Sequence, residues 1–352
     1  MTCAALMSRL AAAGALAFLA TATPSAAADK LTYFTWSGYE LPDFNQSFLA
    51  AHPDGVEIST FGDDDDAFSK VKAGFHPDLA HPCYDKVARR NKEGLLQPID
   101  TAKIKNFEKI FPIFRNLPDL QAGDGKVWMV PWDWGNTSIL YRTDLVKDPA
   151  PSWSLLWDKQ YAGRIATIDA VHDTPVVAAL MAGVSPFDMT PDQMAKVADK
   201  LREQRPLLSS YTTDMTSVEQ ALSSGQLVAA MTWNASATAL RKQGVPVEFL
   251  KPKEGMLTWA CGFVMLKDAK NVDLAYDFIN SRLEAASGKN LITNYGYGAS
   301  TSSAFAEVSK DDLKALQLPD DPEKVLKETV FTGPMKKNDE LAKKFEKVKA
   351  GG

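Results

Sequence analysis

The apolar positions of this chain alternate between strand-length runs and segments with helical spacing. Between residues 31 and 82 the order is strand, helix, strand, helix, strand, and the segments are 31–36, 41–51, 56–60, 66–73 and 77–82. Each helix in such a series returns the chain so that the next strand runs in the same direction. The pattern therefore predicts an α/β fold with a parallel, doubly wound sheet.

A second unit of the same kind is expected further along the chain. Segments 126–131 and 137–142 read as two strands that lead out of the first unit and into the second. The second unit is expected to contain strands 165–168 and 226–233 and helices 191–204 and 217–223. The apolar segment 258–266 could then return the chain to the first unit. A helix at 273–283 and a charged helical segment from 313 to the end follow. Two lobes that the chain crosses more than once enclose a cleft, which suits capture of a small molecule by hinge closure.

The first 28 residues are typical of an export signal. Arg9 precedes an Ala- and Leu-rich run that is too short to span a bilayer comfortably, and Ser25–Ala28 offers small residues for cleavage before Asp29. We expect a mature protein that begins near residue 29 and resides in the periplasm of a Gram-negative cell. An uncleaved membrane anchor is the alternative.

Composition and motifs narrow the function. The formal net charge of the 352-residue chain is -5, and no basic cluster indicates a nucleic-acid partner. No GxSxG, P-loop or GxGxxG motif is present, so we expect no enzyme and no cofactor. An exported hydrolase remains an alternative, with Cys83 as nucleophile and His81 or His172 as base.

Metal binding is also not expected. His76 and His81 flank a proline at an awkward separation for a metal pair. The acidic run 63–66 lacks the alternating ligands, central Gly and terminal Glu of a calcium loop. We interpret that run as a solvated helix N-terminus, where carboxylates favour the helix dipole.

Aromatic residues gather at or just beyond the ends of the expected strands. They are Trp36, Tyr39, Tyr84, Trp132, Trp134, Trp233 and Trp259, and the candidate carboxylates nearby are Asp85, Asp133, Asp169 and Asp173. Aromatic faces attract alkylammonium groups, and carboxylates neutralise their charge. Asp169 in particular ends an apolar strand, at the rim of a sheet where open α/β folds bind ligands. These residues predict a cleft that binds a small amine.

Several motifs, in order, resemble those of the bacterial periplasmic solute-binding proteins for polyamines, the receptors of spermidine/putrescine ABC transporters. The motifs are FTWSGY at 34–39, VPWDWG at 130–135, SWSLLW at 152–157 and MTWNAS at 231–236. The resemblance implies the type II periplasmic-binding-protein fold, and we expect lobe 1 to be 29–138 plus 262–305 and lobe 2 to be 139–261 plus 306–352. It also implies a monomer that delivers its ligand to ABC permease subunits in the inner membrane.

The resemblance also suggests roles for individual residues. Trp36 and Ser37 match the first binding loop of the family, Asp169 matches a carboxylate that binds an amine, and Phe331 lies near a polar contact. The predicted ligand-binding set is Trp36, Ser37, Tyr39, Cys83, Tyr84, Asp85, Trp134, Asp169, Asp173, Trp233, Trp259 and Cys261, with the last two tryptophans sandwiching the alkyl chain.

The chain departs from the family where acidic residues are expected. Gly38, His172 and Cys261 stand at such positions, although Asp173 could replace His172 if the loop shifts by one residue, and Asp85 and Asp133 could compensate. A buried ammonium without a carboxylate costs several kcal/mol. The expected ligand is therefore a polyamine or, alternatively, a monoamine, amino acid, opine or quaternary amine. A receptor whose main role is signalling is a further alternative.

Two cysteines, Cys83 and Cys261, remain after signal removal. If they follow the family positions, they face the cleft from opposite lobes, where a disulfide would hold the receptor shut. We therefore expect two free thiols that shape the pocket.

Overall fold

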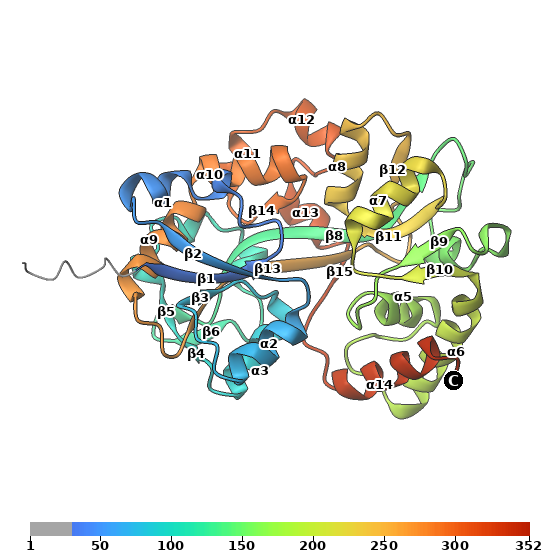
Figure 1. The fold of residues 1–352 in the computed structure, drawn as a ribbon, viewed down its shortest axis with the longest axis horizontal. Coiled ribbons are helices and arrows are strands. Elements are labelled where there is room, and N and C mark those ends of the chain that lie inside the picture. The colour runs from blue at the N-terminus through green and yellow to red at the C-terminus, as the bar shows by residue number, and fades with distance from the viewer. Residues whose placement is uncertain (1–29) are drawn as a thin grey trace, which may run out of the picture.

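The computed structural model describes residues 30–352 and contains two α/β lobes connected by two long strands (Figure 1). In the first lobe, β1 (Leu31–Trp36) pairs in parallel with both β2 (Val56–Phe61) and β3 (Leu79–Ala80). This arrangement confirms the expected parallel unit. The main helices of this lobe are α1 (Gln46–Ala51), α2 (Asp64–Lys72), α3 (Val87–Lys92) and α9 (Val272–Arg282).

The second lobe repeats the parallel arrangement. Its strand β9 (Ile165–Thr167) lies between β10 (Leu208–Tyr211) and β11 (Ala229–Trp233), parallel to both. Its helices are α5 (Thr174–Met181), α6 (Pro191–Gln204), α7 (Met215–Ser224), α8 (Asn234–Lys242) and α14 (Asn338–Lys349). The C-terminal helix α14 lies beside α6, so the end of the chain contributes to the second lobe (Figure 1).

Two strands run through both lobes. β8 (Val130–Arg142) and β13 (Leu257–Leu266) pair antiparallel, and together they join the sheets of the two lobes. The expectation of separate strands at 126–131 and 137–142 is wrong, because Gly135 and Asn136 continue the strand instead of turning the chain. Every residue of β8 except the last is buried, as in a central strand that is covered on both faces.

Shorter elements complete the two lobes. The strands are β4 (Leu96–Gln97), β5 (Ile99–Asp100), β6 (Gln121–Gly123), β7 (Lys126–Val127), β12 (Val247–Phe249), β14 (Gly298–Ala299) and β15 (Val330–Phe331). The short α-helices are α4 (Pro112–Arg115), α10 (Ala285–Asn290), α11 (Ser302–Ala306), α12 (Lys310–Ala315) and α13 (Pro322–Leu326). The 3-10 helices are η1 (Pro42–Phe44), η2 (Tyr84–Lys86), η3 (Thr101–Lys103), η4 (Phe107–Lys109), η5 (Trp153–Trp157), η6 (Lys159–Tyr161) and η7 (Arg205–Leu207), and η8 (Leu291–Tyr295) is a π-helix. In the part of the chain from residue 30 onward, no helix is both long and apolar enough to cross a membrane.

The hydrophobic cores divide the chain at the crossing strands. The core of the first lobe draws on residues between 31 and 134 and between 260 and 326, whereas the cores of the second lobe draw on residues between 139 and 257 and on α14. Val308, Leu313 and Leu318 belong to the first core. We propose that the first lobe extends to about residue 326, beyond the limit at 305 that the sequence suggests.

Gly135 allows β8 to pass closely behind the cleft. A Cβ atom at this position would lie 2.3 Å from the Trp259 ring and 2.7 Å from Asn234 Oδ1. Asn234 Oδ1 also accepts a hydrogen bond from the Asn136 amide at 3.0 Å, so it is not free to move away. The absence of a side chain at Gly135 therefore fixes how near the two crossing strands and α8 can pack.

We expect Gly135→Ala to lower the free energy of unfolding by about 1–3 kcal/mol, because the new methyl group must displace packed atoms. Chemical denaturation monitored by circular dichroism measures this change. The matched control is Gly62→Ala, since a Cβ at Gly62 meets no atom of residues 30–352 within 4 Å. Equal stability of the two variants would contradict the packing described for Gly135.

Candidate functional site

A cavity of about 400 Å³ lies between the lobes where β13 crosses. It collects residues from β1, α2 and η2 of the first lobe, from the loop after β9 and the end of β11 in the second lobe, and from α14. Of the twelve predicted ligand-binding residues, ten line it: Trp36, Ser37, Tyr39, Cys83, Asp85, Asp169, Asp173, Trp233, Trp259 and Cys261. Their roles toward a ligand stay a prediction.

Tyr84 and Trp134, the other two predicted residues, lie in the core of the first lobe. Trp134 is fully buried, and its Nε1 donates to the Ala299 carbonyl at 3.0 Å. Tyr84 is 5 % exposed and its ring centroid lies 6.2 Å from that of Phe331. Successive side chains of a strand point to opposite faces of the sheet. A tryptophan on a strand that borders the cleft, such as Trp134, can therefore point into the hydrophobic core instead.

The aromatic wall of the cavity includes one residue that sequence reasoning missed. Tyr297 lies 5.0 Å from Trp259 in an edge-on arrangement and is parallel to the Tyr39 ring at 6.3 Å. It stands between Gly296, whose φ is +73°, and Gly298, where a Cβ would collide with Trp134. The Gly-Tyr-Gly sequence at 296–298 is the feature of the sequence that could have indicated Tyr297 as a cavity residue. Thr332 also lines the cavity, one residue beyond the expected Phe331.

Asp133 is not available to pair with a ligand cation in the cleft, the role suggested for it from the sequence. Its carboxylate is 1 % exposed and accepts a hydrogen bond of 2.6 Å from the Tyr39 hydroxyl, while its other oxygen lies 2.8 Å from His81 Nε2. Burial, together with the charge of Asp133, raises the pKa of Tyr39 well above its ordinary value. The expected compensation by Asp133 is therefore wrong, because both of its oxygens are engaged inside the first lobe.

Asp85, Lys86 and His172 form a contact between the lobes. Lys86 Nζ lies 3.4 Å from the Asp85 carboxylate and donates to His172 Nδ1 at 3.0 Å, and His172 Nε2 lies 3.2 Å from Asp85. Burial lowers the pKa of His172 to about 4, so the imidazole is neutral at pH 7. A neutral ring that accepts at Nδ1 carries its proton on Nε2, facing Asp85. Asp85 and Lys86 belong to the first lobe and His172 to the second, so this group spans the cleft.

Asp173 is a half-buried carboxylate of the cavity. Its Oδ1 accepts a hydrogen bond of 3.0 Å from the Thr137 hydroxyl, and among residues 30–352 it forms no ion pair. Burial raises its pKa to about 6, although the Thr137 hydrogen bond opposes this change. The carboxylate would therefore gain from a ligand cation.

Asp169 lies in the cavity but is already paired. Its carboxylate accepts a short hydrogen bond from Lys349 Nζ of α14, and the same ammonium lies 2.7 Å from Glu346 Oε1. Burial tends to lower the pKa of Lys349, but hydrogen bonds to Asp169 and Glu346 outweigh it and raise this pKa. No local sequence pattern indicates this pairing, because the two residues are 180 positions apart.

The acidic run at 63–66 begins a helix, as expected. Asp63 is the N-cap of α2 and accepts a hydrogen bond of 2.9 Å from the Asp66 amide. Asp64 and Asp65 face the cavity but are paired: Asp64 with the buried Arg90 through two oxygens, and Asp65 with Arg89 at 2.9 Å. This edge of the cleft therefore carries little free charge.

Cys83 and Cys261 are joined in a disulfide, so the expectation of free thiols is wrong. Cys83 follows β3, and β13 pairs with β3 through Val264 and Met265 shortly after Cys261. The bond therefore lies at the junction of β3 and β13 and does not connect opposite lobes across the cavity. A cysteine held in a disulfide has no thiolate, which argues against the hydrolase alternative.

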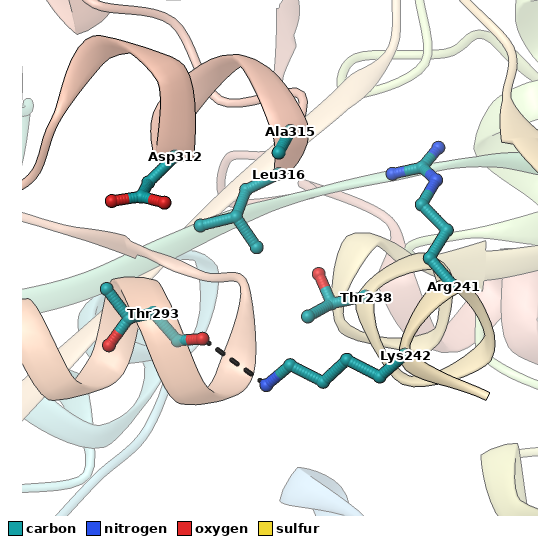
Figure 2. A pocket seen from close by; sticks show the side chains of 7 residues that line it. All are labelled: Thr238, Arg241, Lys242, Thr293, Asp312, Ala315 and Leu316. Carbon is teal, nitrogen blue, oxygen red and sulfur yellow. Dashed lines mark hydrogen bonds between the residues drawn. The ribbon is translucent and has the colours of Figure 1, made fainter. Parts of the chain in front are cut away.

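A second cavity lies between α8 and the helices η8 and α12 (Figure 2). Its volume is about 340 Å³, and Lys242 Nζ donates to the Thr293 carbonyl at 3.4 Å across it. Arg241 and Lys242 outnumber the one lining carboxylate, Asp312, so the net charge of the lining is positive, and none of the predicted site residues lines it. Its charge is opposite to what an amine requires.

Two lobes joined by crossing strands around an aromatic and acidic cleft define a solute-binding protein of the type II periplasmic class. The chain belongs to the family described as bacterial extracellular solute-binding protein, whose model matches residues 43–317.

Named relatives and solved structures agree with this class. The spermidine/putrescine-binding periplasmic protein of Salmonella typhimurium is 29% identical over 293 residues, which is 82% of each chain. A putative spermidine/putrescine ABC transporter structure from Listeria monocytogenes has a TM-score of 0.80 at 24% identity, covering 90% of this chain and 98% of that one. A periplasmic binding protein of A. tumefaciens in complex with glucopine has a TM-score of 0.70 at 16% identity, covering 91% and 100%. The same fold thus occurs with different ligands.

We expect the mature protein, denatured without reductant, to show no reactive thiol, and to show two after reduction. Titration with a chromogenic thiol reagent gives both numbers. Two thiols before reduction would contradict the disulfide, and Cys83→Ser serves as the control because it should expose one thiol without reductant.

Proposed function

We propose that this protein is the substrate-binding component of an ABC importer and captures a small amine-bearing solute in the cleft between its lobes. The observation that carries the proposal is an aromatic cavity that contains Asp173, a carboxylate that forms no ion pair within residues 30–352. Family membership and the printed names of the relatives support it. The remaining parts of the proposal are a periplasmic location, a monomeric state, no enzymatic activity, permease subunits as partners, and an export signal at residues 1–28, which lie outside the described residues.

The proposed binding mode follows from the positions of the lining residues. The ligand ammonium pairs with Asp173, and its carbon chain packs against Trp36, Trp233 and Trp259, whose faces also attract the cation. Trp36 comes from the first lobe and Trp233 from the second, so a ligand that touches both favours the closed arrangement. Differential affinity for that arrangement is what drives closure.

A thermal-shift screen of amines and amino acids on the mature protein tests the proposal. A ligand at 100 times its dissociation constant should add about 2.7 kcal/mol to the free energy of unfolding, which raises the melting temperature. We expect at least one compound with an ammonium group to give this shift, and uncharged alcohols of the same chain length to give none. No shift with any amine would contradict the proposal.

The affinity for a cationic ligand should depend on pH through Asp173. The raised pKa of about 6 means that the carboxylate is ionised above this pH and protonated below it. Affinity should therefore be constant above pH 7 and fall by up to about tenfold per pH unit below pH 6. Titration calorimetry between pH 5 and pH 8 measures this profile. His172 does not titrate in this range, since its pKa is about 4.

The control for this profile is Asp173→Asn, which should bind the cation weakly and with little change between pH 5 and pH 8. An unchanged affinity in this variant would remove Asp173 from the site.

A further inference from the structure

Most carboxylates of the cleft already carry a cation that the protein itself supplies. Asp64, Asp65, Asp85, Asp169 and Glu346 line the cavity and each lies within ion-pair distance of an arginine or lysine. Of the two other lining carboxylates, Asp63 is exposed and caps α2. Asp173 is half-buried, accepts a hydrogen bond from the Thr137 hydroxyl and forms no ion pair among the described residues. Among the described residues, the cavity therefore offers one anchoring point for an ammonium that is shielded from solvent, at Asp173.

We infer that Lys86 and Lys349 are specificity-determining residues that restrict the cleft to ligands with one cationic group and disfavour di- and triamines. This inference rests on the proposed function, since it concerns the class of amine that the same cleft accepts. A diamine must place its second ammonium at another carboxylate, and two of the lining carboxylates, Asp85 and Asp169, are already neutralised by Lys86 and Lys349.

Lys349 is held at Asp169 by several contacts. Its ammonium pairs with Asp169 and with Glu346, and it lies 4.9 Å from the centroid of the Phe345 ring on the same helix. Its side chain is only 18% exposed, so it is not a freely moving surface lysine. Helix α14 packs against α6 of the second lobe through Leu341, Phe345 and Val348, which positions Lys349 before any ligand arrives.

Lys86 acts in the same way on the first lobe. It lies between Asp85 and the neutral His172, and its side chain is 15% exposed. The group of three has no net charge, because the positive charge of Lys86 balances the negative charge of Asp85.

Displacement of either lysine by a ligand ammonium brings little gain. The ligand would exchange one cation for another at the same carboxylate, and the displaced lysine would lose its partner in a partly buried place. At Asp173 no protein cation has to leave. The structure therefore favours a ligand whose second end is uncharged or negatively charged.

The test uses three probes that share a four-carbon chain and differ only at the far end: n-butylamine, 4-aminobutyrate and putrescine. Dissociation constants are measured by calorimetry at pH 7.5 for the mature wild-type protein, for Lys349→Met and for Lys343→Met. Lys343 is the control, because it is exposed on the same helix and no ion pair is recorded for it among residues 30–352. Melting temperatures of the free variants show that each is folded.

We expect wild type to bind n-butylamine or 4-aminobutyrate at least about tenfold more tightly than putrescine. Lys349→Met should bind putrescine at least about tenfold more tightly than wild type does, because Asp169 becomes available to the second ammonium. The same variant should leave the affinity for n-butylamine within about threefold of wild type, and Lys343→Met should change none of the three affinities.

Two results would overturn the inference while the proposed function stands. The first is putrescine binding to wild type as tightly as the other probes, and the second is Lys349→Met without a gain for putrescine. If no probe and no other amine binds wild type or either variant, the proposed function fails and the inference falls with it.

Discussion

The antiparallel pairing of β8 and β13 is the constraint on which the other features depend. Both strands run through both lobes, so their hydrogen bonds fix the line about which the lobes meet. Gly135 on β8 lets the strand pass close to Trp259 on β13, and Cys261 on β13 is bonded to Cys83 of the first lobe. The aromatic wall of the cleft is therefore built on the connection itself, and any motion of the lobes takes place around it.

Electrostatics then decide what this wall can hold. A low-dielectric cleft does not leave carboxylates unpaired without cost, and most of the acidic side chains here are paired by nearby lysines and arginines. Among the cavity carboxylates of residues 30–352 that are shielded from solvent, Asp173 is the exception, and its raised pKa is the sign of that cost. A ligand ammonium would relieve it. The fold alone does not set the ligand, since the similar structures include a complex with glucopine as well as proteins named for polyamines.

Much of the fold could be predicted from the sequence, because its signals are local. Alternating strands and helices at 31–82 indicate the parallel sheet, and strand-end aromatics indicate most of the cleft wall. The errors concern contacts between distant residues. The continuity of β8, the pairing of Asp169 with Lys349 and the burial of Asp133 against Tyr39 and His81 all depend on tertiary packing. The local pattern of apolar and polar residues carries no information on contacts between residues far apart in the sequence. The disulfide between Cys83 and Cys261 is such a contact and could not be predicted from it either.

The central claim is that Asp173, and not Asp169, receives the ligand ammonium. A crystal structure of the mature protein with bound n-butylamine tests it most directly. We expect the amine nitrogen within hydrogen-bond distance of the Asp173 carboxylate, with Lys349 still paired to Asp169. An amine nitrogen bonded to Asp169, with Lys349 displaced, would contradict it.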